Sequence, residues 1–257
     1  MTSRYAVIGD IHSNLQALEA VLGRLEVEAP DAVFCLGDVV GYGSEPNECA
    51  EGVRRVAGGR TIVGNHDIAA FSADPAYGEW FNPVAKAAVA YQRRVLTAEN
   101  LAWLESLPVT MRDGECLFYH GSPVDPDHYL HSAEDIRMAL AVLGPDVEYR
   151  IIFSGHTHVP TAVEIAPDGS LTLDVPRDKS DLEDVIVRLD DNLRYLVNPG
   201  SVGQPRDRVP DAAYLLVDLD EGLLRYRRVP YDVGEARRRI VEAGLPAFLA
   251  ARLERGV

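Results

Sequence analysis

Five short polar motifs recur along the first two thirds of the chain, and each follows an apolar segment. The motifs are Gly9-Asp10-Ile11-His12, Gly37-Asp38, Gly64-Asn65-His66-Asp67, His120-Gly121 and Gly155-His156-Thr157-His158. The preceding segments, at 5–8, 32–36, 61–63, 117–119 and 151–153, are rich in β-branched and aromatic residues and predict buried strands. Open sheets flanked by helices bind ligands just beyond the carboxyl ends of their strands. We therefore expect the five motifs to meet at one edge.

Between these motifs the apolar spacing predicts helices. The first starts near Leu15, with Ser13 or Asn14 as its cap, and a second starts at Pro46. Two further helices, separated by Thr97, fill most of a helical excursion at about 68–110, and another covers 133–143.

After residue 159 the pattern changes to short strands divided by turn residues. They are expected at 161–165, 171–175, 185–189, 195–197, 213–219 and 223–229, forming a largely antiparallel second sheet. A helix is expected at about 234–255. These elements predict an α/β (α+β) fold in which a two-sheet β-sandwich is flanked by helices. We interpret residues 1–257 as a single domain, since nothing near residue 160 has the composition of a linker.

Charge and composition limit the kinds of molecule that this protein is expected to bind. The 257 residues carry a formal net charge of −15, which disfavours tight nonspecific binding to nucleic acid. A small phosphate ester stays compatible, because bound cations would reverse the sign locally. No long uninterrupted apolar run predicts a membrane span, no signal peptide is apparent, and the three cysteines are scattered. We expect a cytoplasmic protein; a homo-oligomer is compatible with the sequence.

Taken singly, the motifs are weak signals, because an isolated Asp-x-His or His-Gly occurs by chance. Together they hold five of the seven histidines, and the other two, His128 and His131, are expected in loops. Carboxylates, an amide and imidazoles at one edge suit two hard-to-borderline metal ions. Mn, Fe, Zn, Co and Ni are not distinguished by such a ligand set.

The five motifs, in this order, closely resemble the signature of the calcineurin-like metallophosphoesterases. The resemblance runs from Tyr5 to about His158, and the segment 198–205 is similar to bacterial and archaeal phosphodiesterases of that superfamily. It implies a β-sandwich between helices, in four layers.

The resemblance also implies roles for the motif residues. One metal would be held by Asp10, His12, Asp38 and His158, and the other by Asp38, Asn65, His120 and His156, with Asp38 bridging them. Our hypothesis is that a metal-bridging hydroxide attacks phosphorus while His66 donates a proton to the leaving oxygen.

Departures from the family pattern bear on the substrate. Gly41 and Tyr42 stand where Ser/Thr protein phosphatases of this superfamily have Asp and Arg, and Val63 stands where they have another Arg. Since a guanidinium grips a phosphomonoester dianion, its loss favours a monoanionic diester. Asp67 could replace the missing orienter of His66, although capping the helix is the favoured role for it.

Several residues are candidates for contacts with the substrate. Asn65 lies beside the proton donor, and Arg206 is either a phosphate contact or an exposed loop arginine. Tyr42, Phe71 and Trp80 could wall the pocket and stack on a base, although packing is the default for each.

Several functions stay open. The leading hypothesis is a dinuclear-metal phosphodiesterase for small or nucleotide-like diesters. The alternatives are a diadenosine-polyphosphate hydrolase, a broad phosphomonoesterase, a Ser/Thr protein phosphatase, and a scaffold without turnover. The intact His66 and ligand motifs count against the scaffold.

Overall fold

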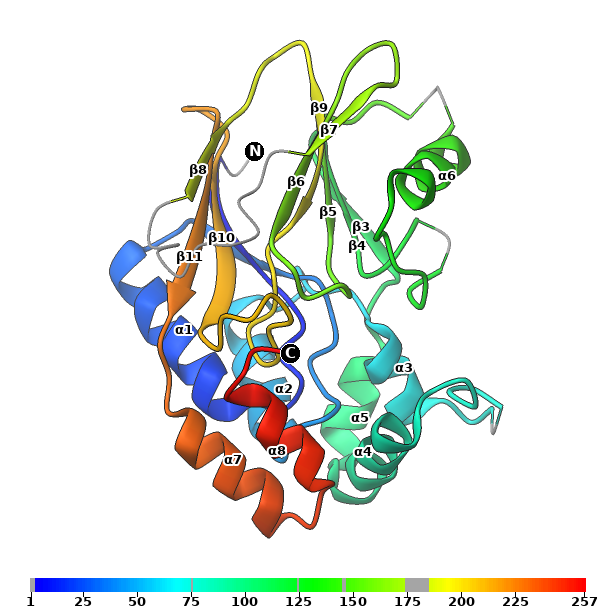
Figure 1. Ribbon diagram of the computed structural model, residues 1–257, viewed down its shortest axis with the longest axis vertical. Coiled ribbons are helices and arrows are strands. Elements are labelled where there is room, and N and C mark those ends of the chain that lie inside the picture. Colours follow the sequence, from blue (N-terminus) through cyan, green and yellow to red (C-terminus); the bar gives the residue numbers. More distant parts are fainter. Residues whose placement is uncertain (1–2, 75, 124, 145–146, 174–184) are drawn as a thin grey trace.

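The computed structural model describes residues 3–74, 76–123, 125–144, 147–173 and 185–257 (Figure 1). The helices are α1 (Leu15–Glu28), α2 (Pro46–Val56), α3 (Asn65–Phe71), α4 (Pro83–Val95), α5 (Ala98–Glu105), α6 (Ala133–Leu143), α7 (Val233–Glu242) and α8 (Ala247–Leu253). The strands are β1 (Arg4–Ile8), β2 (Ala32–Cys35), β3 (Thr110–Asp113), β4 (Cys116–Tyr119), β5 (Ile151–Ser154), β6 (Thr161–Ile165), β7 (Leu171–Leu173), β8 (Val185–Arg188), β9 (Arg194–Asn198), β10 (Ala212–Asp218) and β11 (Leu223–Val229).

The strands form two mixed sheets that face each other in the upper half of Figure 1. One has the order β2-β1-β10-β11-β8, and the other β3-β4-β5-β9-β6-β7. The pairs β1–β2, β4–β5 and β5–β9 are parallel, and the other pairs are antiparallel. The predicted sandwich of two sheets is therefore confirmed.

The strands after residue 159 do not form a second sheet of their own, so that prediction was wrong. Strands β8, β10 and β11 join β1, whereas β6, β7 and β9 join β5. Each sheet thus combines strands from the first part of the chain with strands from the last part, and the late strand β9 runs parallel to β5. The pairing of β1 with β10 joins residues more than 200 positions apart, which no local pattern specifies.

The space between the sheets is filled by aromatic side chains. Phe34 and Phe118 stack with ring centroids 4.4 Å apart, Phe118 lies 5.1 Å from Phe153, and Tyr5 meets Phe34 edge-on at 5.0 Å. Each such ring contributes roughly 1.5–3 kcal/mol by burial. Alternate residues of β1 face the outer side, where Ala6 joins the core under α1 and α2.

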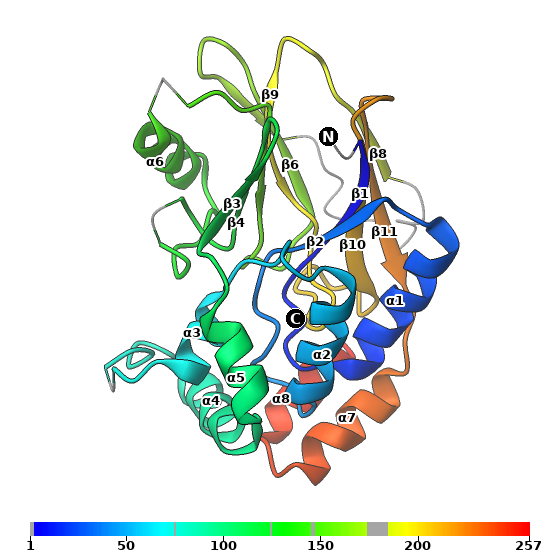
Figure 2. The same cartoon turned by 180° about the vertical axis from the view of Figure 1, so that it is seen from behind.

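Helices cover both outer faces, which gives the expected four layers. Leu18 and Val21 of α1 pack on the first sheet, and Ile136 of α6 packs on the second sheet against Leu117 and Ile152. Figures 1 and 2 show α1 and α6 on opposite outer sides, with the other helices gathered at the lower end of the sandwich. Among the described residues, no helix has the length and apolarity needed to cross a bilayer.

Several local predictions changed. The strand expected at 60–63 is only an isolated bridge between Cys35 and Thr61. The helix expected at 234–255 is two helices, since Gly244 has a φ of +71° and Pro246 directly precedes α8. The edge strand β3 was not predicted, because Thr-Met-Arg-Asp lacks an apolar run. Val175, the expected end of a strand, lies outside the described residues.

Other local predictions are confirmed. The side chain of Asn14 caps α1 by accepting from the Ala17 amide, and Thr97 caps α5 by accepting from the Asn100 amide. His128 lies in a loop, as expected.

Candidate metal centre

The motif residues gather at one end of the sandwich because four strands end there. The segment after β1 carries Asp10 and His12, and the one after β2 carries Asp38. His120 follows β4, while His156 and His158 follow β5. The third motif, Gly64-Asn65-His66-Asp67, reaches the same end in the first turn of α3 and does not follow a strand. The ligand motifs therefore come from both sheets, not from the rim of one.

The backbone of this region is strained. Asp10, His12, Asp38, His156 and His158 have φ values of 52°, 49°, 49°, 65° and 61°. Non-glycine residues rarely adopt this left-handed conformation, which costs roughly 1 kcal/mol or more at each position. The sharp reversals turn successive side chains toward one point.

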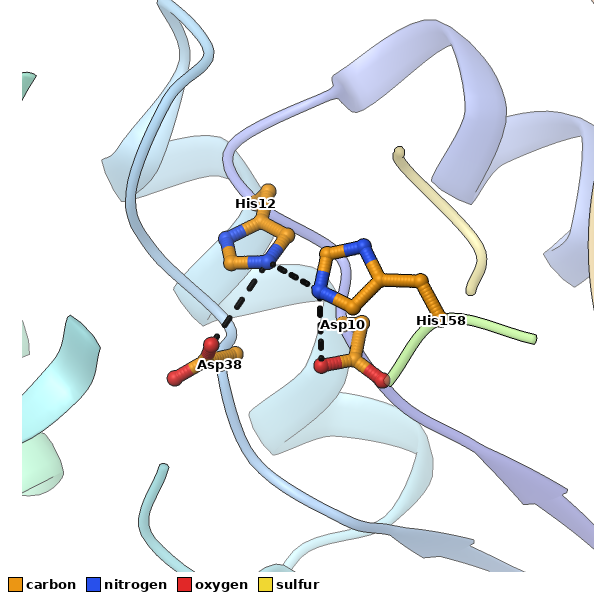
Figure 3. Close-up of side chains that lie close together, drawn as sticks. All are labelled: Asp10, His12, Asp38 and His158. Carbon is orange, nitrogen blue, oxygen red and sulfur yellow. Dashed lines mark hydrogen bonds and ion pairs between the residues drawn. The ribbon is translucent and has the colours of Figure 1, made fainter. Parts of the chain in front are cut away.

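Two side-chain clusters could each hold a metal ion. One comprises Asp10, His12, Asp38 and His158, and the other comprises Asp38, His120 and His156, with candidate ligand atoms within 4.8 Å of one another in each. Figure 3 shows the first cluster converging from three loops. Asp38 belongs to both clusters, as the resemblance implies.

The two oxygens of Asp38 have different surroundings. Oδ1 accepts a hydrogen bond from the His66 amide at 2.8 Å. Oδ2 lies 3.5 Å from His12 Nε2 and 3.3 Å from His120 Nε2, and it is a buried atom without a hydrogen-bond partner among the described residues. Such an oxygen is costly unless a cation satisfies it. The donor set therefore fits a metal on each side of Asp38.

The histidine rings are held so that their lone pairs face inward. His12 Nδ1 lies 3.2 Å from the Val40 carbonyl, and His158 Nδ1 lies 2.6 Å from the Gln204 carbonyl. A carbonyl can only accept, so both rings donate from Nδ1 and present an unprotonated Nε2. These two Nε2 atoms are 3.1 Å apart and face each other, which suits a cation between them.

The charges of the ligand side chains follow from burial and proximity. Burial lowers the pKa of His12 and of His158 well below the usual range, so both rings are neutral. Burial raises the pKa of Asp10 to about 7. For Asp38 burial acts in the same direction, but the imidazoles of His120 and His66 outweigh it and hold the pKa below its usual range.

His120 carries the matching positive charge. Burial alone would lower its pKa, but the Asp38 carboxylate raises it to about 10. Its Nδ1 lies 2.7 Å from the Leu36 carbonyl, which leaves Nε2 for the shared centre. A proton on Nε2 occupies the space that a metal ion would take, and metal binding is expected to release it.

Asn65 and His66 lie at the start of α3. The Asn65 Oδ1 atom is 3.1 Å from His120 Nε2, so the amide oxygen faces the second cluster. The ring of His66 lies 5.0 Å from His12 and 4.4 Å from Tyr42, and its buried Nδ1 has no hydrogen-bond partner among the described residues. Burial lowers the pKa of His66 to about 4.

Asp67 helps to cap α3 and has no contact with the His66 ring. Its Oδ1 accepts from the Val40 amide at 2.9 Å, and its Oδ2 accepts from the Gly64 amide at 3.0 Å. It is the third residue of α3, and its contact with the amide of Gly64, the N-cap residue, belongs to a capping box. Asp67 thus ties the loop after β2 to the start of α3, and the predicted orienting role lacks a contact.

The segment 198–205 supports the first cluster from behind. Asn198 Nδ2 donates to the Gly155 carbonyl at 2.7 Å and to Thr157 Oγ1 at 2.9 Å. Ser201 Oγ donates to the Asp10 carbonyl at 2.7 Å. These positioning roles were not predicted, although the segment was noted for its resemblance.

A cavity of about 160 Å³ opens beside His66, and its wall includes Tyr42, Trp80, Phe81 and Asp127. Trp80, 59% exposed, forms part of the rim. Phe71 instead packs into the core with α1 and α2. Tyr42 has both of the predicted roles, since it lines this cavity and also packs in a hydrophobic cluster with α4, α7 and α8.

Arg206 is half-buried rather than an exposed loop arginine. It donates to Gln204 Oε1 at 3.2 Å and reaches the Tyr129 hydroxyl at 3.5 Å. The Tyr129 ring stacks on His156 with centroids 3.8 Å apart and lines the cavity. Tyr129 and Asp127 were missed from the sequence, because neither belongs to a motif.

Comparisons with known proteins agree with this geometry. Residues 4–222 match the calcineurin-like phosphoesterase superfamily domain. An uncharacterized protein of Methanocaldococcus jannaschii is 35% identical over 255 residues, covering 98% of this chain and 97% of that protein.

Solved structures are similar over the whole chain. The crystal structure of a metallophosphoesterase from Sphaerobacter thermophilus has a TM-score of 0.82 and 36% identity, covering 99% of each chain. A hypothetical protein from Pyrococcus horikoshii OT3 shares the fold with a TM-score of 0.74 and 22% identity, covering 99% of this chain and 98% of that one. With its Asp and His clusters at the strand ends, the chain belongs to the calcineurin-like phosphoesterase superfamily.

Proposed function

We propose that the protein is a dinuclear-metal phosphodiesterase that hydrolyses small or nucleotide-like diesters. The observation that carries the proposal is the position of Asp38 in both ligand clusters, with a buried Oδ2 that lacks a hydrogen-bond partner among the described residues. A carboxylate shared in this way suits two cations held close together. Mn, Fe, Zn, Co and Ni all fit ligands of this type.

Two bound metal ions would supply Lewis acidity, which activates water and draws charge from the phosphate oxygens. The protein supplies the ligands and the proton. The ring of His66 lines the cavity, and its own amide is fixed on Asp38 Oδ1. His66 is therefore held in register with the shared carboxylate, and we assign it the transfer of a proton to the leaving oxygen. This role requires the bound phosphate anion to raise the pKa of the ring from about 4.

The diester preference is supported by the residues around His66. A Cβ atom added at Gly41 would lie 2.8 Å from His66 Nδ1, so no larger side chain fits there unless the ring moves. Gly41 thus has no side chain there, and its neighbour Tyr42, whose ring lies 4.4 Å from His66, offers no guanidinium to bind a dianion. The half-buried Arg206 is the candidate for a contact to the single charge of a diester.

The test is an assay with Mn²⁺-loaded protein on bis(p-nitrophenyl) phosphate and p-nitrophenyl phosphate. We expect a higher kcat/KM for the diester. A preference for the monoester, for diadenosine polyphosphates or for phosphoserine peptides would replace the proposal with the corresponding alternative. Absence of turnover with all of them would favour a scaffold.

We also place the protein in a reducing compartment, the cytoplasm. Cys35, Cys49 and Cys116 are all buried free thiols, which is usual where disulfides do not form. Fractionation of the native cells would test this, and recovery from an oxidising compartment would contradict it.

A further inference from the structure

Asp127, in the loop between β4 and α6, is hydrogen-bonded to three side chains from the first turn of α3 and the excursion behind it. Its Oδ1 accepts from Asn65 Nδ2 at 2.9 Å and from Trp80 Nε1 at 3.3 Å. Its Oδ2 accepts from the Tyr77 hydroxyl at 2.9 Å. No motif of the sequence includes Asp127, and the proposed chemistry does not use it.

The bond to Asn65 decides which end of that amide faces the metal centre. The oxygen and nitrogen ends of an amide are nearly the same in shape, so packing alone does not distinguish them. Both carboxyl oxygens of Asp127 accept hydrogen bonds, so Oδ1 takes the Nδ2 end of Asn65. Asn65 Oδ1 is then turned to His120 Nε2, 3.1 Å away, where a ligand of the second cluster is needed.

The backbone of the same residue acts on a second ligand. The Asp127 carbonyl lies 3.1 Å from His156 Nε2 and can only accept, so this ring donates from Nε2. His156 then presents its Nδ1 lone pair, whereas His12 and His158 present Nε2. Hydrogen bonds of this kind fix the tautomer and the direction of a metal-binding imidazole.

We infer that Asp127 is a positioning residue for the second metal, through its carboxylate on Asn65 and its carbonyl on His156. The inference rests on the proposed dinuclear site. Because Tyr77 and Trp80 share the carboxylate, it also links the helical excursion to the metal centre. A substrate group that contacts these two rings would thereby act on the same hydrogen-bond network.

The experiment is a calorimetric titration of the metal-free protein with Mn²⁺, in a double-mutant cycle of Asp127→Ala and Asn65→Ala. Asp127→Ala removes the carboxylate and keeps the backbone carbonyl. We expect about 10–100-fold weaker binding of one of the two ions and little change for the other. In the Asn65→Ala background the further loss from Asp127→Ala should be less than about 3-fold, because the partner is absent.

Two variants serve as controls. Tyr77→Phe removes one donor to Asp127 without touching Asn65 and should change Mn²⁺ affinity by less than about 3-fold. Asp127→Asn keeps an acceptor oxygen and should restore part of the affinity. Circular dichroism and the melting temperature of each metal-free variant show whether it is folded. If Asp127→Ala does not fold, the Mn²⁺ affinity of Asp127→Asn tests the inference in its place.

The outcomes separate the inference from the proposed function. Additive losses in the cycle, equal losses for both ions, or a Tyr77→Phe effect as large as that of Asp127→Ala would overturn the positioning role. A wild-type protein that binds only one Mn²⁺ would overturn both proposals. A non-additive cycle in a protein without diester turnover would uphold Asp127 and reject the phosphodiesterase.

Discussion

Replacing Asp10 by asparagine should stabilise the metal-free protein while it abolishes metal binding. Asp10 is 0% exposed, and both of its oxygens accept from the His156 amide, at 3.1 and 3.2 Å. Its Oδ1 also lies 3.4 Å from His158 Nε2, which carries a lone pair. Without a metal, two acceptors thus face each other. The amide in Asp10→Asn keeps an oxygen for the His156 amide and offers an N–H to His158.

The size of the effect follows from the buried charge. Burial raises the pKa of Asp10 from 3.8 to about 7, so the fold favours the neutral acid and loses stability as the pH rises from 3.8 through about 7. Holding the charge at neutral pH then costs on the order of 4 kcal/mol. Neighbouring groups that readjust offset part of it, so we expect a gain of about 2 kcal/mol, or roughly 5 °C in Tm.

The assay compares chelator-treated wild type and Asp10→Asn by thermal unfolding at pH 5 and pH 8. The difference should be larger at pH 8, where the wild-type carboxylate is charged. Asp38→Asn is the matched control: the pKa of Asp38 is held low, so its charge stabilises the fold and its loss should lower Tm. A metal-free Asp10→Asn protein that melts below wild type at pH 8 would refute the reasoning.

Three further predictions concern the site and the core. His66→Asn should lower kcat for the diester about 100-fold or more at unchanged metal content; metal loss in elemental analysis would make His66 a ligand. Gly64→Ala should impair metal binding, because its Cβ would lie 2.2 Å from Asp38 Oδ1; dialysis against Mn²⁺ checks this, and wild-type stoichiometry would contradict it. Burial raises the pKa of Cys116 from 9.0 to about 11. The contribution of this thiol to the free energy of unfolding should therefore fall between pH 9 and 11. In urea unfolding this loss approaches about 1.4 kcal/mol per pH unit, and it should be absent in Cys116→Ala.

The sequence by itself determined the local elements and the motif residues. A strand of alternating or continuous apolar residues, or a capped helix such as α1 with Asn14, depends on neighbours a few positions away. The same holds for the order of the ligand motifs, because four of them follow a strand and the motif with Asn65 and His66 begins a helix. For this reason the two-sheet sandwich and the cluster around Asp38 could be expected before any coordinates.

Only the tertiary structure decided how the strands after residue 159 are divided between the two sheets. It also decided which residues outside the motifs support the site. The pairing of β1 with β10 is a contact between distant segments, chosen by the packing of both sheets on one aromatic core. Asp127 looks like any loop aspartate in the sequence, because its role depends on Asn65, 62 residues away, pointing its amide at it. Asp67 likewise carried a predicted role beside His66 until its two oxygens were found on the Val40 and Gly64 amides. Hydrogen-bond direction is set by three-dimensional placement, and residue type alone does not encode it.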